Sequence, residues 1–300
     1  MGKNRLDHIA IIGSTGLVGY EVTKKIIKNA DYKRLTTASF NKNNKRYLLN
    51  KQNHFFGDFN NKISWLKILK SQPNVIVLIS NCRHLLALEE AINSSNKYKV
   101  NNIRFIIVGT TGIFSPVNEY SGIYKTIEKK IKELNFEKYT ILRPNLIYGS
   151  YRDKNISKVI NFIKKYKFIP SLSGDIGKIQ PLYYEDLVNV IIHCIYKKNL
   201  NGAFNITSNE CLNYNDFYKE IFNALNQKKI ILKVPYKFSL FISKIIEFSL
   251  GADFFINIER IKRLKENKCF SNYEAIEQNF YKPTSFKDGI NKQIEELNRK

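Results

Sequence analysis

The sequence predicts an α/β fold in which a doubly wound parallel sheet is joined to a smaller, mainly helical C-terminal lobe. Two observations predict it. Through the first half of the 300-residue chain, short apolar runs alternate with stretches of helical spacing. Beyond Gly149 the stretches become mostly helical, and no internal repeat or low-complexity linker separates the two parts. Hydrophobic residues make up 43% of the chain, which is enough for a substantial core.

The first half contains most of the predicted strands, and most of these are short apolar runs. They lie at residues 8–13, 34–40, 74–80, 103–109 and the beginning of 139–149. Helical spacing predicts intervening helices at residues 19–30, 65–72, 85–95 and 123–134. Strands that are apolar along their whole length are typical of a parallel sheet with helices on both faces. We therefore expect a Rossmann-type sheet domain at residues 1–150.

The second half is predicted to be helical with a short strand. The helices lie at residues 155–170, 185–198, 213–226 and 286–297, and the strand lies at 202–207. Glu185 and Asp186 begin the second of these helices, where carboxylates are favourable. We expect residues 151–300 to form a smaller interleaved lobe that binds substrate, and segments near 180–207 to return to the sheet domain.

The chain is strongly basic. It has 49 Lys and Arg against 26 Asp and Glu, which gives a net charge of +23. Such a charge suits nucleic acid, an anionic membrane or a small molecule that carries phosphate. The lysines are spread along the chain, and no helix-turn-helix, zinc or RNA-binding motif accompanies them. We therefore expect no nucleic-acid partner, while a phosphate-bearing substrate is compatible with the charge.

The sequence predicts no membrane span and no export signal. Its most apolar stretch, residues 238–250, is interrupted by Lys244 and Glu247 and is shorter than the roughly 18 residues that a span requires. It predicts an amphipathic helix that is buried or lines a groove, with a membrane-surface helix as the alternative. The N-terminus leads into a strand pattern without an apolar signal region, so we expect a cytoplasmic location.

The cysteines and histidines predict neither a metal site nor a disulfide. Cys82, Cys194, Cys211 and Cys269 are far apart and follow no zinc or disulfide spacing. The four histidines are also scattered, so no set of metal ligands is apparent.

A glycine turn follows the first predicted strand. The sequence "IIGSTGLVG" places Gly13, Gly16 and Gly19 between that strand and the first helix. Gly13 permits a tight turn, Gly16 lets the backbone approach a pyrophosphate, and Gly19 lets the helix pack close to the sheet. The N-terminus of the helix favours an anion. The pattern therefore predicts a dinucleotide site, with a merely tight turn as the alternative.

Residues at and after the end of the second predicted strand bear on the choice between NAD and NADP. An acidic residue near its end would bind the ribose hydroxyls of NAD, and no Asp or Glu occurs from Tyr32 through Gly57. Lys42, Lys45 and Arg46 follow the strand instead. They favour NADP, because they are able to meet a 2′-phosphate, although a solvated basic loop would have the same sequence.

Several motifs, taken in order, resemble those of a known superfamily. After the glycine turn come "GDF" (57–59), "ILRPNLIYG" (141–149), "IQPLYYEDLVNVI" (179–191), "GAFNITSNECLNYNDF" (202–217) and "CFSNYEAIEQNFYKPTSFKDGI" (269–290). The chain resembles the NAD-dependent epimerase/dehydratase family of the extended short-chain dehydrogenase/reductase superfamily over nearly its whole length. The resemblance implies a Rossmann-type fold and an NAD(P) cofactor.

The resemblance also implies roles for residues at matching positions. The cofactor would be held by the turn and by segments after later strands, at Gly13, Ser14, Thr15, Gly16, Leu17, Val18, Gly19, Asp58, Phe59, Leu78, Ile79, Ser80 and Lys125. Asp58 would lie near the adenine, and residues 78–80 near the nicotinamide. Thr111 matches the catalytic Ser/Thr of the family, and Lys125 matches the lysine of its YxxxK motif.

The chain departs from the family at the catalytic tyrosine. That tyrosine lies four residues before the lysine, and here the position holds Ser121. Tyr120 is one residue earlier and Tyr124 is adjacent to Lys125, so on a regular helix both lie on other faces. An irregular first turn at Gly122 would let Tyr120 reach the site. The chain looks like a divergent member of the family, with Tyr120 and Tyr124 as alternative acid/base residues.

Two functions are consistent with this resemblance. As an enzyme, the protein would be an NAD(P)-dependent epimerase, dehydratase or reductase acting on a nucleotide-linked sugar, in surface-polysaccharide or related carbohydrate metabolism. Asn145 and Arg152 would then contact the substrate. Alternatively, it would be a non-catalytic NAD(P)-binding redox sensor or assembly subunit. A homodimer is possible in either case.

Overall fold

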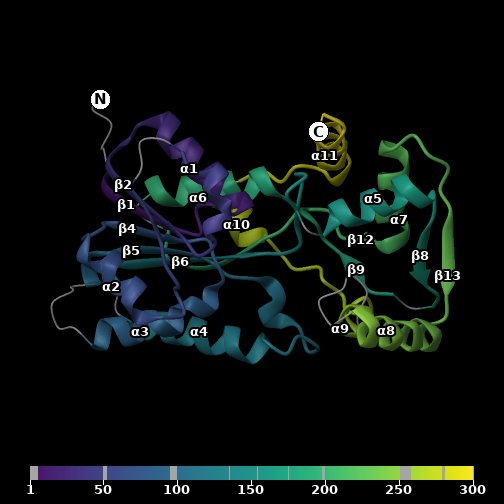
Figure 1. The fold of residues 1–300 in the computed structure, drawn as a ribbon, viewed down its shortest axis with the longest axis horizontal. Helices are drawn as coiled ribbons and strands as arrows, with labels where there is room; N and C mark the ends of the chain where they lie inside the picture. Colours follow the sequence, from purple (N-terminus) through teal and green to yellow (C-terminus); the bar gives the residue numbers. More distant parts are fainter. Residues whose placement is uncertain are drawn as a thin grey trace.

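A seven-stranded parallel sheet forms the centre of the computed structural model, in the order β11-β6-β5-β4-β1-β2-β3 (Figure 1). The structure describes residues 6–49, 53–94, 100–134, 136–153, 155–174, 176–197, 200–250, 258–278 and 281–299, the side chains of 245–250 excepted. The strands are β1 (Leu6–Ile12), β2 (Tyr32–Ser39), β3 (Asn53–Phe56), β4 (Val75–Leu78), β5 (Arg104–Val108), β6 (Lys138–Pro144) and β11 (Gly202–Ile206). The predicted α/β fold with a parallel sheet is confirmed.

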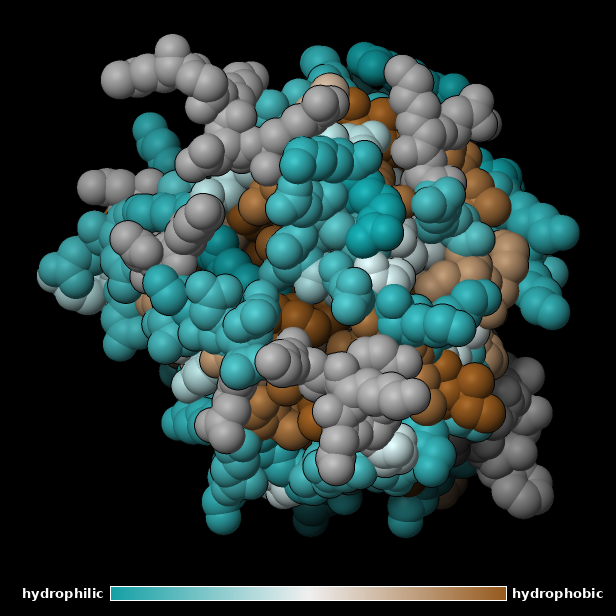
Figure 2. Space-filling model, turned by 90° about the vertical axis from the view of Figure 1, so that its left-hand side faces the viewer, coloured by the Kyte–Doolittle hydropathy of each residue, from teal (hydrophilic) through white to brown (hydrophobic). Residues whose placement is uncertain are grey.

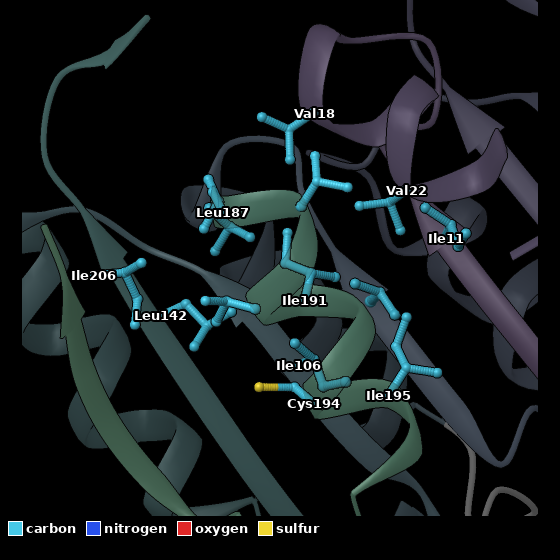
Figure 3. Packing of buried hydrophobic residues seen from close by; sticks show 14 of the residues in the cluster. Ile11, Val18, Val22, Ile106, Leu142, Leu187, Ile191, Cys194, Ile195 and Ile206 are labelled. Atoms are coloured by element: carbon cyan, nitrogen blue, oxygen red, sulfur yellow. The ribbon is translucent and has the colours of Figure 1, made fainter. Parts of the chain in front are cut away.

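Helices cover both faces of the sheet. One face carries α1 (Leu17–Asn29) and α6 (Tyr184–Tyr196), and the other carries α2 (Lys62–Lys70), α3 (Leu85–Asn93) and α4 (Ser121–Glu133). Because side chains alternate along a strand, Ile9 and Ile11 of β1 pack under α1 and α6, whereas Ala10 and Ile12 pack under the other layer. Figure 3 shows the first of these cores, where Ile191 and Ile195 of α6 lie over the sheet.

The later part of the chain contributes to both lobes. Strand β11 pairs with β6, and α6 packs beside α1, so two segments from beyond residue 180 complete the sheet layer. The smaller lobe lies beside the sheet and contains α5 (Ile156–Tyr166), α7 (Tyr214–Ala224) and α11 (Phe286–Asn298) (Figure 1). Its own buried cluster includes Ile160, Phe222 and Phe286.

Short strand pairs supplement the helices of the smaller lobe. They join β8 (Ile169–Leu172) to β13 (Ile231–Val234), β9 (Lys178–Ile179) to β12 (Leu212–Asn213), and β7 (Ile147–Tyr148) to β10 (Leu182–Tyr183). The remaining helices are α8 (Tyr236–Leu250), α9 (Ile258–Arg263) and α10 (Tyr273–Glu277). Stretch 238–250, predicted to be helical, lies within α8. Within the described ranges, no helix is both long enough and apolar enough to cross a membrane.

A disulfide joins Cys211 to Cys269, with their Cα atoms 5.6 Å apart. The prediction that the cysteines form no disulfide is therefore wrong. The two residues are separated by 58 positions in the sequence, and the fold brings the start of β12 beside the segment that follows α9. Spacing rules detect ligands and local bridges, and they do not detect a contact made by folding over such a distance. Cys82 and Cys194 are free and buried.

The end of the sheet opposite to the smaller lobe has a mixed surface. Figure 2 views the molecule from that side and shows hydrophilic side chains over much of the face, with hydrophobic ones visible in separate places. The loops that resemble functional motifs lie at the other end, toward the smaller lobe.

Candidate functional site at the carboxyl edge of the sheet

The loops after β1, β4, β5 and β6 meet at the carboxyl edge of the sheet. Parallel strands end on the same side, so the glycine turn, Ser80, Thr111 and Asn145 all lie along this edge. The strand order reverses between β1 and β4, and such a switch point is where open α/β sheets bind ligands.

The glycine turn is packed tightly against the sheet. Gly13 has a φ of +94°, and a Cβ there would lie 2.7 Å from the Ser80 backbone nitrogen. Its own N–H donates to the carbonyl of Ala38 at 2.8 Å, which holds the turn to the end of β2. A Cβ at Gly19 would lie 2.1 Å from the Gly13 carbonyl oxygen. Both positions therefore require glycine on steric grounds.

Gly16 differs because it borders open space. It is exposed, and a Cβ there would meet only the Gly13 carbonyl oxygen, at 3.4 Å. The first helical hydrogen bond of α1 runs from the Tyr20 N–H to the Gly16 carbonyl, so the N–H groups of residues 17–19 precede the helical pattern. The positive end of α1 is thus accessible at Gly16, which is compatible with the pyrophosphate of a dinucleotide.

The other predicted cofactor residues occupy different environments. Val18, Phe59 and Leu78 belong to the two cores that flank the sheet. Asp58 is exposed, and its carboxylate accepts hydrogen bonds from the backbone and side chain of Asn60. Buried Ser14 and Thr15 and half-buried Leu17, Ile79 and Ser80 lie at the edge itself, whereas Lys125 lies on α4.

A cavity of about 240 Å³ adjoins the loops after β5 and β6. It lies between the sheet edge and the segment that follows α9. Its lining comes from both lobes: Thr111, Gly112, Phe114, Ser115, Pro116 and Asn145 on one side, and Arg263, Glu266, Asn267, Lys268 and Phe270 on the other. The fold thus brings predicted residues Thr111 and Asn145 together with a segment in which the sequence analysis found no site residue.

Hydrogen bonds connect the two sides of this cavity. The side-chain amide of Asn145 donates to the Lys268 carbonyl at 2.6 Å, and the Ser115 hydroxyl donates to the Glu266 carboxylate. The buried Thr111 hydroxyl donates to the Pro144 carbonyl at 3.4 Å, which is long for a hydrogen bond from a hydroxyl. The disulfide at Cys269 further fixes the segment from the smaller lobe.

The cavity is cationic and contains a perturbed lysine. Arg263 and Lys268 line it together with one carboxylate, Glu266, and the Arg263 guanidinium is paired with Glu266 at 3.3 Å and with Glu259 at 3.7 Å. Burial, assisted by the charge of Arg263 and opposed by that of Glu266, lowers the pKa of Lys268 to about 8. The sequence contains no signal for this residue, because it is one basic residue among 49.

The family's tyrosine and lysine positions lie on α4, outside the cavity lining. Ser121 is buried, and its hydroxyl donates to the Ile113 carbonyl at 3.1 Å. Lys125 is exposed. Tyr124 is half-buried against the core, and burial raises the pKa of its phenol. The Tyr120 ring lies 4.4 Å from the Arg83 guanidinium.

The two tyrosines are themselves four residues apart, which the sequence analysis missed because it measured both from Lys125. Their ring centroids lie 6.5 Å apart along one side of α4. Within the described residues, no group of three or more His, Cys, Asp or Glu side chains is arranged to hold a metal ion.

Comparison with known proteins finds similarity in structure but not in sequence. No protein-family model and no curated protein matches the chain. UDP-glucose 4-epimerase from Thermotoga maritima, solved with UDP-glucose, is 15% identical, with a TM-score of 0.73 and coverage of 97% of this chain and 99% of that one.

Two further structures have the same fold. dTDP-glucose 4,6-dehydratase from Bacillus anthracis, solved with NAD, is 15% identical, with a TM-score of 0.72 and coverage of 97% and 96%. An NADPH-dependent quinone oxidoreductase from Escherichia coli, solved with NADPH, is 11% identical, with a TM-score of 0.70 and coverage of 94% and 98%. At such identities the likeness shows the fold: this chain has the same α/β architecture as these three structures.

Proposed function

We propose that the protein is an NAD(P)-dependent enzyme that oxidises or reduces a carbinol on a nucleotide-linked sugar. The outcome would be epimerisation, dehydration or simple reduction, as part of carbohydrate metabolism such as the synthesis of surface polysaccharides. One observation carries the proposal. The glycine turn at the N-terminus of α1 and the cationic cavity at Thr111 lie along the same edge of the sheet.

The glycine turn would hold the cofactor pyrophosphate. Bound there, the dinucleotide supplies an acceptor or donor of hydride. Lys42, Lys45 and Arg46, all exposed on the 3-10 helix η1 (Lys42–Tyr47) after β2, favour NADP because they are able to bind its 2′-phosphate. Structures of similar fold contain NAD in one case and NADPH in another, so the comparison is compatible with either cofactor.

The cavity would receive the sugar and its phosphates. Arg263 provides positive charge for a diphosphate, and Asn145 provides an amide for a sugar hydroxyl. The Thr111 hydroxyl would hold the reacting oxygen in place of its long bond to Pro144. The net charge of +23 would also attract an anionic substrate.

The proton would be exchanged by Lys268. In the family, tyrosine performs this role, and here neither Tyr120 nor Tyr124 lines the cavity. Lys268 lies on the wall opposite Thr111 and Asn145, and its pKa of about 8 permits both the amine and the ammonium near neutral pH. As amine it would accept the proton of the substrate hydroxyl, and as ammonium it would return it.

Titration of the purified protein with NADH and NADPH, followed by nicotinamide fluorescence, tests the proposal first. We expect binding of at least one dinucleotide. Gly16→Val should reduce the affinity by about 100-fold or more, because its branched side chain would fill the space over the helix N-terminus. Unchanged affinity in this variant would remove the turn from the cofactor site. UDP-glucose and dTDP-glucose are the first substrates to assay.

A non-catalytic dinucleotide-binding protein is the second candidate. It is favoured by Ser121, which occupies the tyrosine position and uses its hydroxyl to bind the Ile113 carbonyl. Such a redox sensor or assembly subunit would bind NADH or NADPH and turn over no nucleotide sugar. The enzyme proposal is contradicted if tight dinucleotide binding is accompanied by no turnover across a broad panel of nucleotide sugars.

A further inference from the structure

A cation–aromatic cluster of Arg152, Tyr47 and Tyr20 lies directly on the glycine turn. The Arg152 guanidinium is 3.6 Å from the centroid of the Tyr47 ring and 5.5 Å from that of Tyr20. The two rings meet edge to face at 5.7 Å. The Nη2 of Arg152 donates to the Thr15 carbonyl, inside the turn, at 2.6 Å. The Arg152 cluster therefore contacts the turn itself, whereas Arg152 does not line the cavity at Thr111.

Three separate segments build the Arg152 cluster. Tyr20 lies in the first turn of α1, Tyr47 ends η1 after β2, and Arg152 follows β7 at the entrance to the smaller lobe. The loop that carries Arg152 is firmly anchored. The buried Asp153 carboxylate accepts hydrogen bonds from the N–H groups of Asn155 and Ile156, at 2.6 and 2.9 Å, at the start of α5. The guanidinium is thus held beside the turn by its bond to the Thr15 carbonyl and by the anchored loop that carries it.

The charge of Arg152 is available to an anion. Its polar partner is a neutral carbonyl, and within the described part of the chain no carboxylate lies in ion-pair contact with it. A guanidinium has five N–H donors in a plane, so its bond to Thr15 leaves donors for a phosphate. The Tyr47 ring packs against one face of the guanidinium plane. The N–H groups at the edge of that plane are left to bind an anion.

We propose that Arg152 binds the pyrophosphate of the dinucleotide and closes the glycine turn from the side of the smaller lobe. The N–H groups at the start of α1 would bind the phosphates from one side, and the guanidinium would bind them from the other. This assignment rests on the proposed function, because it requires a dinucleotide at the turn. Arg152 would then contact the cofactor, and not the substrate as predicted from the sequence.

Arg46 provides a matched comparison. Its guanidinium lies 4.9 Å from the centroid of the same Tyr47 ring, but the residue is exposed on η1 and belongs to the basic group expected to meet a 2′-phosphate. A pyrophosphate is common to NADH and NADPH, whereas a 2′-phosphate occurs only in NADPH. The two arginines should therefore differ in which ligands they affect.

The test is fluorescence titration of wild type, Arg152→Gln, Arg152→Lys and Arg46→Gln with NADH and NADPH, with calorimetric titration of ADP. Arg152→Gln should weaken all three ligands by about 10-fold to 100-fold, and Arg152→Lys should weaken them less, because it keeps the charge. Arg46→Gln should weaken NADPH alone. The affinity of wild type for NADH should fall more steeply with salt than that of Arg152→Gln.

The outcomes separate the two proposals. If wild type binds none of the three ligands, the proposed function fails and this inference fails with it. If wild type binds and Arg152→Gln binds equally well, the inference alone is wrong. Tighter binding by Arg152→Gln would also overturn it, since Arg152 would then occupy the site in competition with the ligand. Thermal unfolding of each variant shows whether a loss of affinity accompanies a loss of fold, and the Arg152→Lys result decides the matter if Arg152→Gln does not fold.

Discussion

The pKa of an ordinary lysine is about 10.4, and that of Lys268 is lower because the cavity at Thr111 half-buries it beside Arg263. The ionised groups that face it are Arg263 and Glu266 of its own segment, and the sheet edge contributes no titratable side chain to the cavity. The lowered pKa favours the neutral amine in the folded protein. Stability should therefore rise with pH between about 8 and the pKa of an unfolded lysine, since the unfolded chain binds the extra proton there.

The lowered pKa of Lys268 also leads to a prediction for catalysis. If its amine accepts the substrate proton, the rate of substrate oxidation should rise with pH and level off above about 8, and the rate of reduction should fall over the same range. Lys268→Met should lower turnover by about 100-fold or more and leave NADPH affinity within about twofold. The pH–rate profile with UDP-glucose or dTDP-glucose, whichever is turned over, measures both effects.

Lys262 supplies the control for that experiment because it lies nearby in the chain, on α9, and is exposed. Lys262→Met should leave the profile unchanged. An unaltered pH profile in Lys268→Met would remove Lys268 from the proton transfer and return the role to Tyr120 or Tyr124.

At the scale of elements, α1 and α4 each contain a glycine near the N-terminus, in opposite surroundings. A Cβ at Gly19 of α1 would lie 2.1 Å from the Gly13 carbonyl oxygen, whereas a Cβ at Gly122 of α4 would meet nothing within 4 Å. The first glycine allows the helix to approach the turn, and the second only adds backbone freedom.

The substitution Gly19→Ala should therefore destabilise the protein, and Gly122→Ala should stabilise it. The first forces α1 away from the turn and should lower the free energy of unfolding by about 1–3 kcal/mol. The second should raise it by about 0.5–1 kcal/mol, because alanine is the better helix former. Urea unfolding of both variants measures the difference. Equal effects of the two substitutions would contradict the close packing of α1 against the turn.

The elements also show where spacing arguments succeed and where they do not. The alternation of apolar runs with helical stretches predicted the parallel sheet because each strand and helix is encoded within its own residues. Helix α4 was predicted in the right place, but counting residues from Lys125 did not reveal which face of the helix is buried. The buried face carries Ser121, Ile127 and Ile131, and Lys125 is exposed, because packing against the sheet decides which face turns inward.

For the whole molecule, the disulfide between Cys211 and Cys269 is the covalent link that the sequence analysis did not anticipate. It encloses a long loop, so chain entropy in the unfolded state suggests a stabilisation of up to about 4 kcal/mol. It also holds Lys268 and Phe270, on either side of Cys269, at the cavity. Disulfides are typical of oxidising compartments, and the cytoplasmic location stays a prediction.

Reduction of this disulfide should lower the thermal midpoint and loosen the cavity. We expect the double substitution of Cys211 and Cys269 by serine to weaken substrate binding, while NADPH affinity at the glycine turn stays within about twofold. Calorimetry with and without reductant, together with NADPH titration of the serine variant, provides the measurement. A serine variant with the wild-type thermal midpoint would show that the link contributes nothing to stability.

By itself, the sequence determined the alternation of strands and helices, the parallel sheet and the position of the glycine turn. Each of these depends on interactions between residues close in the chain, such as helical spacing, apolar runs and the steric freedom of Gly13. The tertiary structure decided the rest. Asn145 contacts Lys268 across 123 positions, and Arg152 contacts Thr15 across 137. No local pattern encodes such pairs, because they arise only when the smaller lobe packs against the carboxyl edge of the sheet.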